Sequence, residues 1–230
     1  SLFVILTNID KLGGVLTSIM SEAFSSNAVY GGLIGVLVTG IKRAVFSNEG
    51  GVGSASIAHS AAKTDEPVRE GIVAMVGPFI DTIVVCFMTA SVILITKDAN
   101  PLYQVGGGIN GAELTSAAFG SVISWFPIIL SAVVFLFSYS TMISWYYYGN
   151  KGWKYLFGDS TIPLYQAIYL GCTVLGAIAS LGNVMDFSDM MILSCAFPNI
   201  IGAMFMLPKL KIALDDYWSR YTAGTFKTYK

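Results

Sequence analysis

Charge is scarce in this sequence. Charged residues make up 12% of its 230 residues, where an average soluble domain has about 25%. Hydrophobic residues make up 54%, and the mean hydropathy is +0.67. No basic stripe with interleaved aromatic residues is present, which excludes a nucleic-acid-binding surface. The composition predicts an all-α polytopic membrane protein that lies in the lipid bilayer of the cell membrane.

Cysteine and histidine are also rare, which leaves little for metal or enzyme chemistry. Cys86, Cys172 and Cys195 lie in apolar stretches without metal-type spacing or a disulfide pattern, so we interpret them as packing residues. The single histidine, His59, lies among alanines and serines that cannot complete a metal site or a catalytic triad, and we interpret it as structural or interfacial. The sequence contains no cluster of acidic, basic or metal-binding residues that would indicate an enzyme.

The stretch from Tyr30 to Lys63 has an apolar first part, a polar glycine-rich middle and a helical last part of small residues. It is much longer than the roughly 20 residues that a membrane helix needs. We interpret it as a broken helix whose unwound middle faces a cavity, because buried charges are costly in lipid. The alternative is one span ending near Val45, followed by a cytoplasmic loop and a surface helix.

Four further spans are predicted, at 71–96, 125–148, 162–181 and 185–207, the last with Asp186 or Ser188 as its N-cap. Loops are expected at 63–70, where Pro67 acts as a breaker, at 97–111 and at 150–160. Surface helices are expected at 10–24 and 112–123. The chain divides into residues 1–29, the end of a truncated span plus an extracellular helix; 30–207, a five-helix membrane repeat; and 208–230, a polar tail. Ser1 opens directly into an apolar run, so we expect a fragment of a longer protein.

The distribution of lysine and arginine predicts the orientation. Basic residues gather in the loops at 63–70 and 150–160 and in the tail, whereas Lys11 and Lys97 lie on the alternate side. The positive-inside rule therefore makes the C-terminus cytoplasmic. Five spans with a broken first member are typical of one half of an inverted-repeat transporter, whose other half would lie upstream.

Several motifs resemble the alanine or glycine:cation (sodium) symporter family. They are GIKRAVFSNEGGVGSASIAHSAAKTDEPVREG, PFIDTIVVCFMTA, FSYSTMISWYYYGNKGWKYLFG and FPNIIG, in that order between Gly32 and Leu207. Gly50 departs from the alanine expected after Ser-Asn-Glu. The resemblance implies the second half of a leucine-transporter-type fold of five-plus-five inverted helices. It also implies sodium-coupled symport of alanine or glycine by alternating access, with the N-terminal half of the carrier as the missing partner. A proton-coupled or other-substrate carrier, or a non-transporting half-carrier, is the alternative.

A broken helix offers N–H groups to a substrate carboxylate and carbonyl groups to cations. The candidate substrate-binding residues at the break are Phe46, Ser47, Asn48, Gly50 and Gly51, and those one helix away are Thr141 and Trp145. For Phe46 simple packing is an equal alternative, and for Trp145 the alternative is an interfacial anchor. Glu49 is expected to pair with Lys42 or Arg43. The glycines lack the Gly-Lys-Ser of a phosphate loop.

Oxygen ligands suit a hard cation such as sodium. Asp81 and Thr82 lie well inside their span, where an ionisable group is a functional candidate. For Asp81 the alternative is a salt bridge to Arg43 or a cap on the broken helix. In the fold that the resemblance implies, Ser140 and Thr141 match hydroxyl ligands of sodium, with Ser138 as a third. For these hydroxyls the alternative is a hydrogen bond to a carbonyl one turn earlier.

Overall fold

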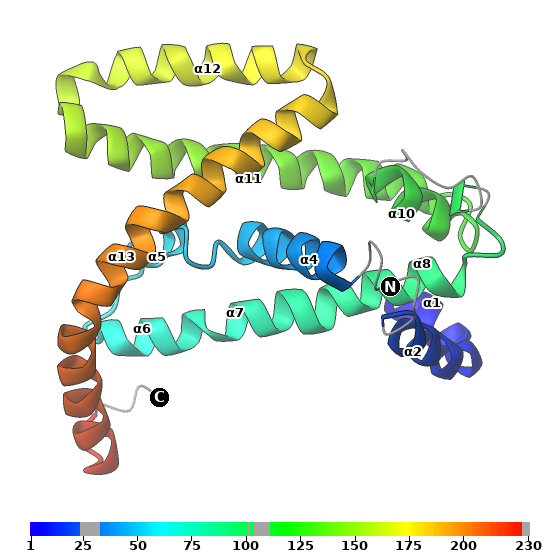
Figure 1. The fold of residues 1–230 in the computed structure, drawn as a ribbon, viewed down its shortest axis with the longest axis horizontal. Helices are drawn as coiled ribbons and strands as arrows, with labels where there is room; N and C mark the ends of the chain where they lie inside the picture. The colour runs from blue at the N-terminus through cyan, green and yellow to red at the C-terminus, as the bar shows by residue number, and fades with distance from the viewer. Residues whose placement is uncertain (24–32, 101, 104–110, 227–230) are drawn as a thin grey trace. The chain divides into compact units, whose positions relative to one another are not determined.

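The computed structural model of the protein describes residues 1–23, 33–100, 102–103 and 111–226 (Figure 1). The described residues form helices and no β-strand, which confirms the all-α class. The chain divides into two compact units, Ser1–Gly40 with Phe79–Ile162 and Ile41–Pro78 with Pro163–Lys230. Tyr30 to Gly32, the first residues of the proposed broken helix, lie outside the described residues.

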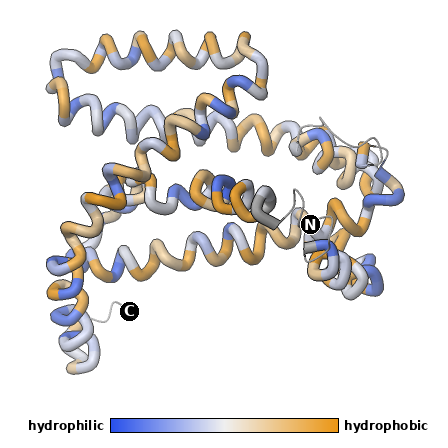
Figure 2. The backbone as a smooth tube through the Cα atoms, in the orientation of Figure 1, coloured by the Kyte–Doolittle hydropathy of each residue, from blue (hydrophilic) through white to orange (hydrophobic). Residues whose placement is uncertain are grey.

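Four helices in the described part of the chain are long and apolar enough to cross a membrane: Pro67–Ile95, Phe126–Phe157, Asp159–Ile178 and Leu181–Thr222. Figure 2 shows apolar positions along the length of these helices. Large apolar side chains on them are exposed, including Phe135 at 70% and Phe205 at 81%. Such exposure suits helices that face lipid rather than water.

The core of the first unit lies around helix α8 (Phe87–Ile95). Helices α1 (Leu2–Thr7), α2 (Ile9–Ala23) and α10 (Gly111–Gly120) pack against α8. Their buried apolar side chains form one cluster, which consists of Val4, Ile5, Val15, Val92, Ile95, Ala118 and Phe119. The segments predicted as surface helices at 10–24 and 112–123 are therefore helical, and each contributes to this core.

The helix Pro67–Ile95 changes its hydrogen-bonding pattern along its length. It begins as α6 (Pro67–Ala74), continues as α7 (Val76–Pro78), becomes the π-helix η1 (Phe79–Cys86) and ends as α8. Pro67 was expected to be a breaker, but it occupies the first turn of α6, where a proline costs no hydrogen bond. Pro78 lies inside the helix and cannot donate to the carbonyl four residues earlier, and the wider π turns follow it directly.

Two of the last three long helices extend beyond their predicted C-terminal ends, and the one between them ends three residues earlier than predicted. α11 (Phe126–Phe157) continues through the expected loop at 150–160 and ends where Gly158 has a φ of 80°. The short helix η2 (Asp159–Thr161) leads into α12 (Ile162–Ile178). α13 (Leu181–Thr222) continues through Pro198 and Pro208 and through most of the expected tail.

The N-cap of α13 is Ser180, so the prediction of Asp186 or Ser188 was wrong. Ser180 has extended backbone angles, and the helix begins at Leu181 and continues through Gly182, so it starts earlier than the apolar run alone indicates. In the second unit, α6 packs against both α5 (Ser54–His59) and α13.

Candidate functional site

The helix is interrupted between α4 (Leu33–Asn48) and α5. Residues 49–53 between them are not helical. Glu49, Gly51 and Gly53 have φ angles of 52°, 80° and 95°. Glycine adopts such angles without a side-chain clash, whereas Glu49 carries a penalty of roughly 1 kcal/mol. The two glycines therefore let the chain leave one helix and start the next.

Asn199 of α13 contacts this interruption within the second unit. Its side-chain Nδ2 donates a hydrogen bond to the Gly51 carbonyl at 2.8 Å. A Cβ atom on Gly53 would lie 2.9 Å from Asn199 Oδ1, which is closer than two such atoms can approach. The Asn199 side chain thus bonds to Gly51 and leaves no room for a Cβ atom at Gly53. Asn199 lies in the FPNIIG motif but had no predicted role, although a polar residue directly after an intrahelical proline was the available signal.

The predicted substrate residues lie on and beside the interruption. Phe46 is 36% exposed in the last turn of α4, and the Asn48 side chain donates to the Ala44 carbonyl at 3.1 Å. Ser47 is exposed, and Gly50 has open space where a Cβ would be. Phe46, Ser47 and Gly50 are therefore accessible at the end of α4.

Behind the interruption, Val52 and Ser54 are buried. Within the described residues, the Ser54 hydroxyl oxygen has no hydrogen-bond partner. The Ser56 hydroxyl donates to the Gly53 carbonyl at 2.6 Å. The side of the interruption that faces the protein is therefore closely packed.

The two basic residues of α4 pair with Asp189 of α13. Lys42 Nζ lies 3.0 Å and Arg43 Nη2 lies 2.5 Å from the same oxygen, Oδ2, of Asp189. The Asp189 side chain is only 8% exposed. The expected pairing of Glu49 with these residues was wrong, because the positive φ at Glu49 follows the end of α4 while Asp189 faces both cations. Asp189 was not among the residues predicted from the sequence.

The predicted sodium ligands belong to the first unit. Asp81 and Thr82 lie in the π-helix η1, a type of turn that is frequent at functional sites. On α11, the Ser140 and Thr141 hydroxyls both donate to the Phe137 carbonyl, at 2.9 and 2.8 Å. This is the back-bonded arrangement named as the alternative.

The other two predicted residues of α11 lie on either side of these hydroxyls. Ser138 is exposed on the same helix, and the Trp145 ring meets the Tyr148 ring edge-on with centroids 5.8 Å apart. These residues lie in the first unit, and residues 46–51 lie in the second.

Comparison with known proteins identifies the family. The family model described as "Sodium:alanine symporter family" matches residues 1–230. The chain belongs to this family. It is 39% identical over 208 residues to the sodium/alanine symporter AgcS of Methanococcus maripaludis, covering 89% of this chain and 45% of that protein.

Two further relatives come from Bacillus subtilis. The chain is 36% identical over 226 residues to the probable sodium/glutamine symporter GlnT, covering 96% of this chain and 46% of the relative. It is 33% identical over 233 residues to the amino-acid carrier protein AlsT, covering 100% of this chain and 49% of the relative. The chain therefore spans about half the length of these curated relatives. The family consists of secondary transporters, not enzymes.

His59 has a structural partner in this member of the sodium:alanine symporter family. Its Nδ1 is hydrogen-bonded to Glu70 Oε1 of α6 at 2.8 Å. The pair joins α5 to α6 beside an open pocket of about 480 Å³. The bond holds the short helix after the interruption against its neighbour.

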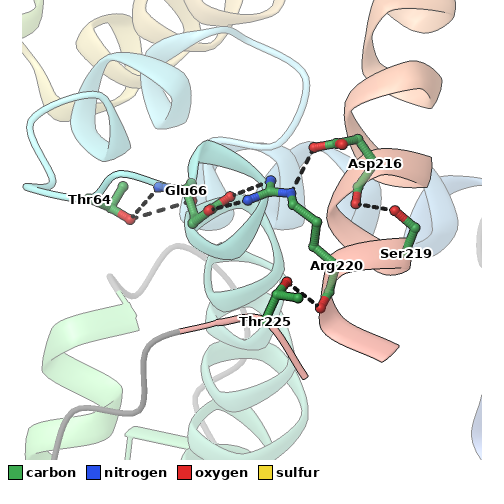
Figure 3. A network of polar contacts seen from close by, with 6 residues as sticks. All are labelled: Thr64, Glu66, Asp216, Ser219, Arg220 and Thr225. Carbon is green, nitrogen blue, oxygen red and sulfur yellow. Dashed lines mark hydrogen bonds and ion pairs between the residues drawn. The ribbon is translucent and has the colours of Figure 1, made fainter. Parts of the chain in front are cut away.

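A second ionic link joins the start of α6 to the end of α13. Arg220 donates two hydrogen bonds to the Glu66 carboxylate, at 2.6 and 2.9 Å, and a third from Nε to Asp216 at 2.9 Å (Figure 3). The Arg220 guanidinium also lies over the Phe226 ring, 5.1 Å from its centroid. An open pocket of about 540 Å³ adjoins these residues. Two parallel hydrogen bonds to one carboxylate fix orientation as well as distance.

We expect this link to weaken in acid. The hydrogen bonds from Arg220 lower the pKa of the Glu66 carboxyl below its ordinary value of 4.5. A carboxyl with a lowered pKa stabilises the fold above its ordinary pKa, and that stabilisation is lost as the pH falls through the lowered value. In thermal unfolding of the purified protein, Glu66→Gln should therefore lower the melting temperature at pH 7 and make no difference at a pH below the lowered pKa.

Asp65→Asn, the exposed neighbour in the same loop, is the matched control. It should leave the melting temperature unchanged at both pH values. A difference between Glu66→Gln and the wild type that is constant down to the lowest pH would show that the carboxylate charge is not what holds Arg220.

Proposed function

We propose that the chain forms part of a sodium-coupled symporter that carries a small amino acid, alanine or glycine, across the cell membrane. The observation that carries this proposal is the interruption between α4 and α5, with its positive φ angles at Gly51 and Gly53. Membership of the sodium:alanine symporter family and the printed names of its relatives support it. A zwitterionic substrate needs both hydrogen-bond donors and acceptors, and an interrupted helix offers both in one place.

The substrate contacts proposed at the interruption are its peptide groups at Gly50 and Gly51 and the side chains of Phe46, Ser47 and Asn48. Phe46 supplies an apolar wall, and the exposed end of α4 supplies polar atoms. Thr141 and Trp145 of α11 are proposed as further substrate contacts. A small pocket favours alanine or glycine, although each additional methylene changes the binding free energy by only about 1–3 kcal/mol.

The sodium ligands proposed are oxygen atoms of Ser138, Ser140, Thr141, Asp81 and Thr82. The hydrogen bonds of Ser140 and Thr141 to the Phe137 carbonyl are compatible with this role. A hydroxyl that donates its proton to a carbonyl keeps its lone pairs, which point elsewhere and can bind a cation. The back-bonded rotamer therefore fixes the direction from which sodium would approach.

For the whole carrier we propose the leucine-transporter-type arrangement of two inverted five-helix repeats, of which this chain supplies the second. The length of the relatives, about twice that of this chain, supports an N-terminal half as its partner. The excess of basic residues in the tail supports a cytoplasmic C-terminus. Sodium and substrate would bind between the repeats, and transport would proceed by alternating access.

The test is uptake of radiolabelled alanine and glycine by liposomes that contain the whole carrier. With one sodium ion per substrate, a tenfold inward sodium gradient should support about tenfold accumulation, because each factor of ten in either gradient is worth about 1.4 kcal/mol. Replacing sodium by choline should abolish accumulation. Accumulation that is unchanged in choline would reject sodium coupling.

The same assay tests the proposed sodium ligands. Thr141→Ala should raise the sodium concentration for half-maximal uptake about tenfold, with a smaller effect on the maximal rate. Thr173→Ala on α12 is the matched control, because the Thr173 hydroxyl makes the same type of bond, to the Tyr169 carbonyl at 2.9 Å. An unaltered sodium dependence in Thr141→Ala would remove Thr141 from the site.

Proton coupling is the second candidate, and the His59–Glu70 pair favours it because a hydrogen-bonded histidine and carboxylate can take up a proton. A pH gradient imposed in the absence of sodium distinguishes the two. It should drive accumulation only if the proton is the coupling ion.

A further inference from the structure

The interruption between α4 and α5 presents donors and acceptors whose directions must be fixed if they are to bind one charged solute. An unwound segment with glycines at positive φ has many accessible conformations, because glycine lacks the Cβ that restricts its backbone. A neighbouring side chain that bonds to the segment can select one of them. In the described residues, the Gly51 carbonyl accepts such a bond from Asn199.

The contact of Asn199 is specific in two ways. Its Nδ2 lies 2.8 Å from the Gly51 oxygen, and its Oδ1 occupies the space that a Cβ on Gly53 would need. The neighbouring Ile200 side chain approaches within 3.9 Å of the Cβ position of Gly51. Consecutive residues of α13 therefore line the interruption at both of its left-handed glycines.

Asn199 comes directly after Pro198 inside α13. Pro198 has no N–H, so α13 lacks one internal hydrogen bond at this turn. The long-range partner of Asn199 lies 148 residues away in the chain. A polar side chain in an apolar membrane helix is costly unless it is bonded, so this contact accounts for its presence there.

The bond also sets the direction of the peptide group. No peptide bond in the described residues is cis. In a trans peptide the C=O and the next N–H point in opposite directions. Because the Gly51 carbonyl points at Asn199 on α13, the N–H of Val52 points away from α13. The donor side of the unwound segment is thus the side opposite α13.

We propose that Asn199 is a positioning residue that fixes the Gly51–Val52 peptide so that its N–H faces the carboxylate of the transported amino acid. This inference rests on the proposed function and names a residue of α13 that acts on the substrate through the backbone. Asn199 does not touch the substrate. It determines which side of the interruption attracts an anion.

The test uses the isosteric variant Asn199→Asp in the whole carrier, with Asn199→Ala beside it. An aspartate fills the same space beside Gly53, but its ionised carboxylate cannot donate to the Gly51 carbonyl. At pH 7.5 we expect the KM for alanine to rise about tenfold in both variants, with a smaller change in the maximal rate. In Asn199→Asp, lowering the external pH to 4 should restore part of the affinity, because a carboxyl with the ordinary aspartate pKa of about 3.9 is then close to half protonated and can donate. Asn199→Ala should show no such recovery.

The control is Ser194→Ala, on the same helix one turn before Pro198. The Ser194 hydroxyl bonds to the Met190 carbonyl of its own helix at 2.7 Å, and its loss should leave KM unchanged. If Asn199 only supports the fold, both variants at position 199 should lose melting temperature and maximal rate with an unaltered KM and no pH-dependent recovery. That result would overturn the proposal.

Hydrogen–deuterium exchange of residues 49–53 separates this inference from the proposed function. Faster exchange there in Asn199→Ala than in Ser194→Ala is expected whatever the carrier transports. If the wild type takes up neither alanine nor glycine but the exchange difference is present, the proposed substrate is wrong and the positioning of the segment stands. If the wild type transports and the exchange rates are equal, Asn199 does not position the segment.

Discussion

Replacing Gly53 by alanine is expected to reduce amino-acid uptake by the whole carrier about thirtyfold. The φ of 95° at Gly53 lies in the region where a residue with a Cβ is strained, at a cost of about 1–2 kcal/mol. The new methyl group would also lie 2.9 Å from Asn199 Oδ1, so the Asn199 side chain must shift away from Gly53, which weakens its hydrogen bond to the Gly51 carbonyl. A total near 2 kcal/mol corresponds to roughly a thirtyfold smaller population of the held conformation. The measurement is the initial rate of alanine uptake, normalised to the amount of carrier in the membrane.

Gly176→Ala, on α12 and outside the proposed site, is the matched control. Gly176 does not have a positive φ, and a Cβ there would meet nothing within 4 Å. Uptake should therefore stay within about twofold of the wild type, because a compatible Gly→Ala change is worth only about 0.4–1 kcal/mol. Equal losses in both glycine variants would mean that the backbone angle at Gly53 is unimportant.

Asp189→Asn is expected to destabilise the protein strongly. Lys42 and Arg43 share one oxygen of Asp189, which is nearly buried, so the neutral amide would leave two cations without their counter-charge. Removing one partner of a buried ion pair costs about 3–5 kcal/mol, and partial exposure of the two basic side chains, at 35% and 43%, favours the lower end. Thermal unfolding of the purified carrier in detergent, followed by intrinsic fluorescence, should show a clear drop in melting temperature.

Asp186→Asn provides the comparison on the same helix, one turn earlier, because Asp186 is exposed. Its melting temperature should match the wild type within error. A triple variant, Lys42→Gln with Arg43→Gln and Asp189→Asn, should be more stable than Asp189→Asn alone, since no unpaired charge remains. If the triple variant were the least stable of all, the cluster would contribute through packing instead of charge.

Much of the helical architecture could be predicted because lipid imposes a simple rule on composition. A span must be apolar over about 20 residues, so hydropathy predicted spans at 71–96, 125–148, 162–181 and 185–207, and the structure has helices at 67–95, 126–157, 159–178 and 181–222. Their ends were less predictable. The polar residues at 150–157 and 209–222 are compatible with both a loop and a helix outside the bilayer, and α11 and α13 continue through them.

The candidate site was predictable only where chemistry is local. The glycines of the interruption signal a backbone that cannot stay helical, and the residues around them could be named from that signal. The partners could not. Asn199 contacts Gly51 in the interruption across 148 residues of sequence, and Asp189 contacts Arg43 of α4 across 146. Neither periodicity nor hydropathy carries information about such pairings. Glu49 was the nearest acid to Lys42 in sequence, but the fold brings Asp189 to that position instead.

The length of α13 has a mechanical consequence. Its 42 residues extend over roughly 60 Å, about twice the thickness of the hydrocarbon layer. The helix is therefore long enough to extend well beyond the hydrocarbon layer. A tilt of about 10° over the outer half would move its end by roughly 5 Å. Because Arg220 near that end donates two hydrogen bonds to Glu66, the same tilt would also displace the first turn of α6.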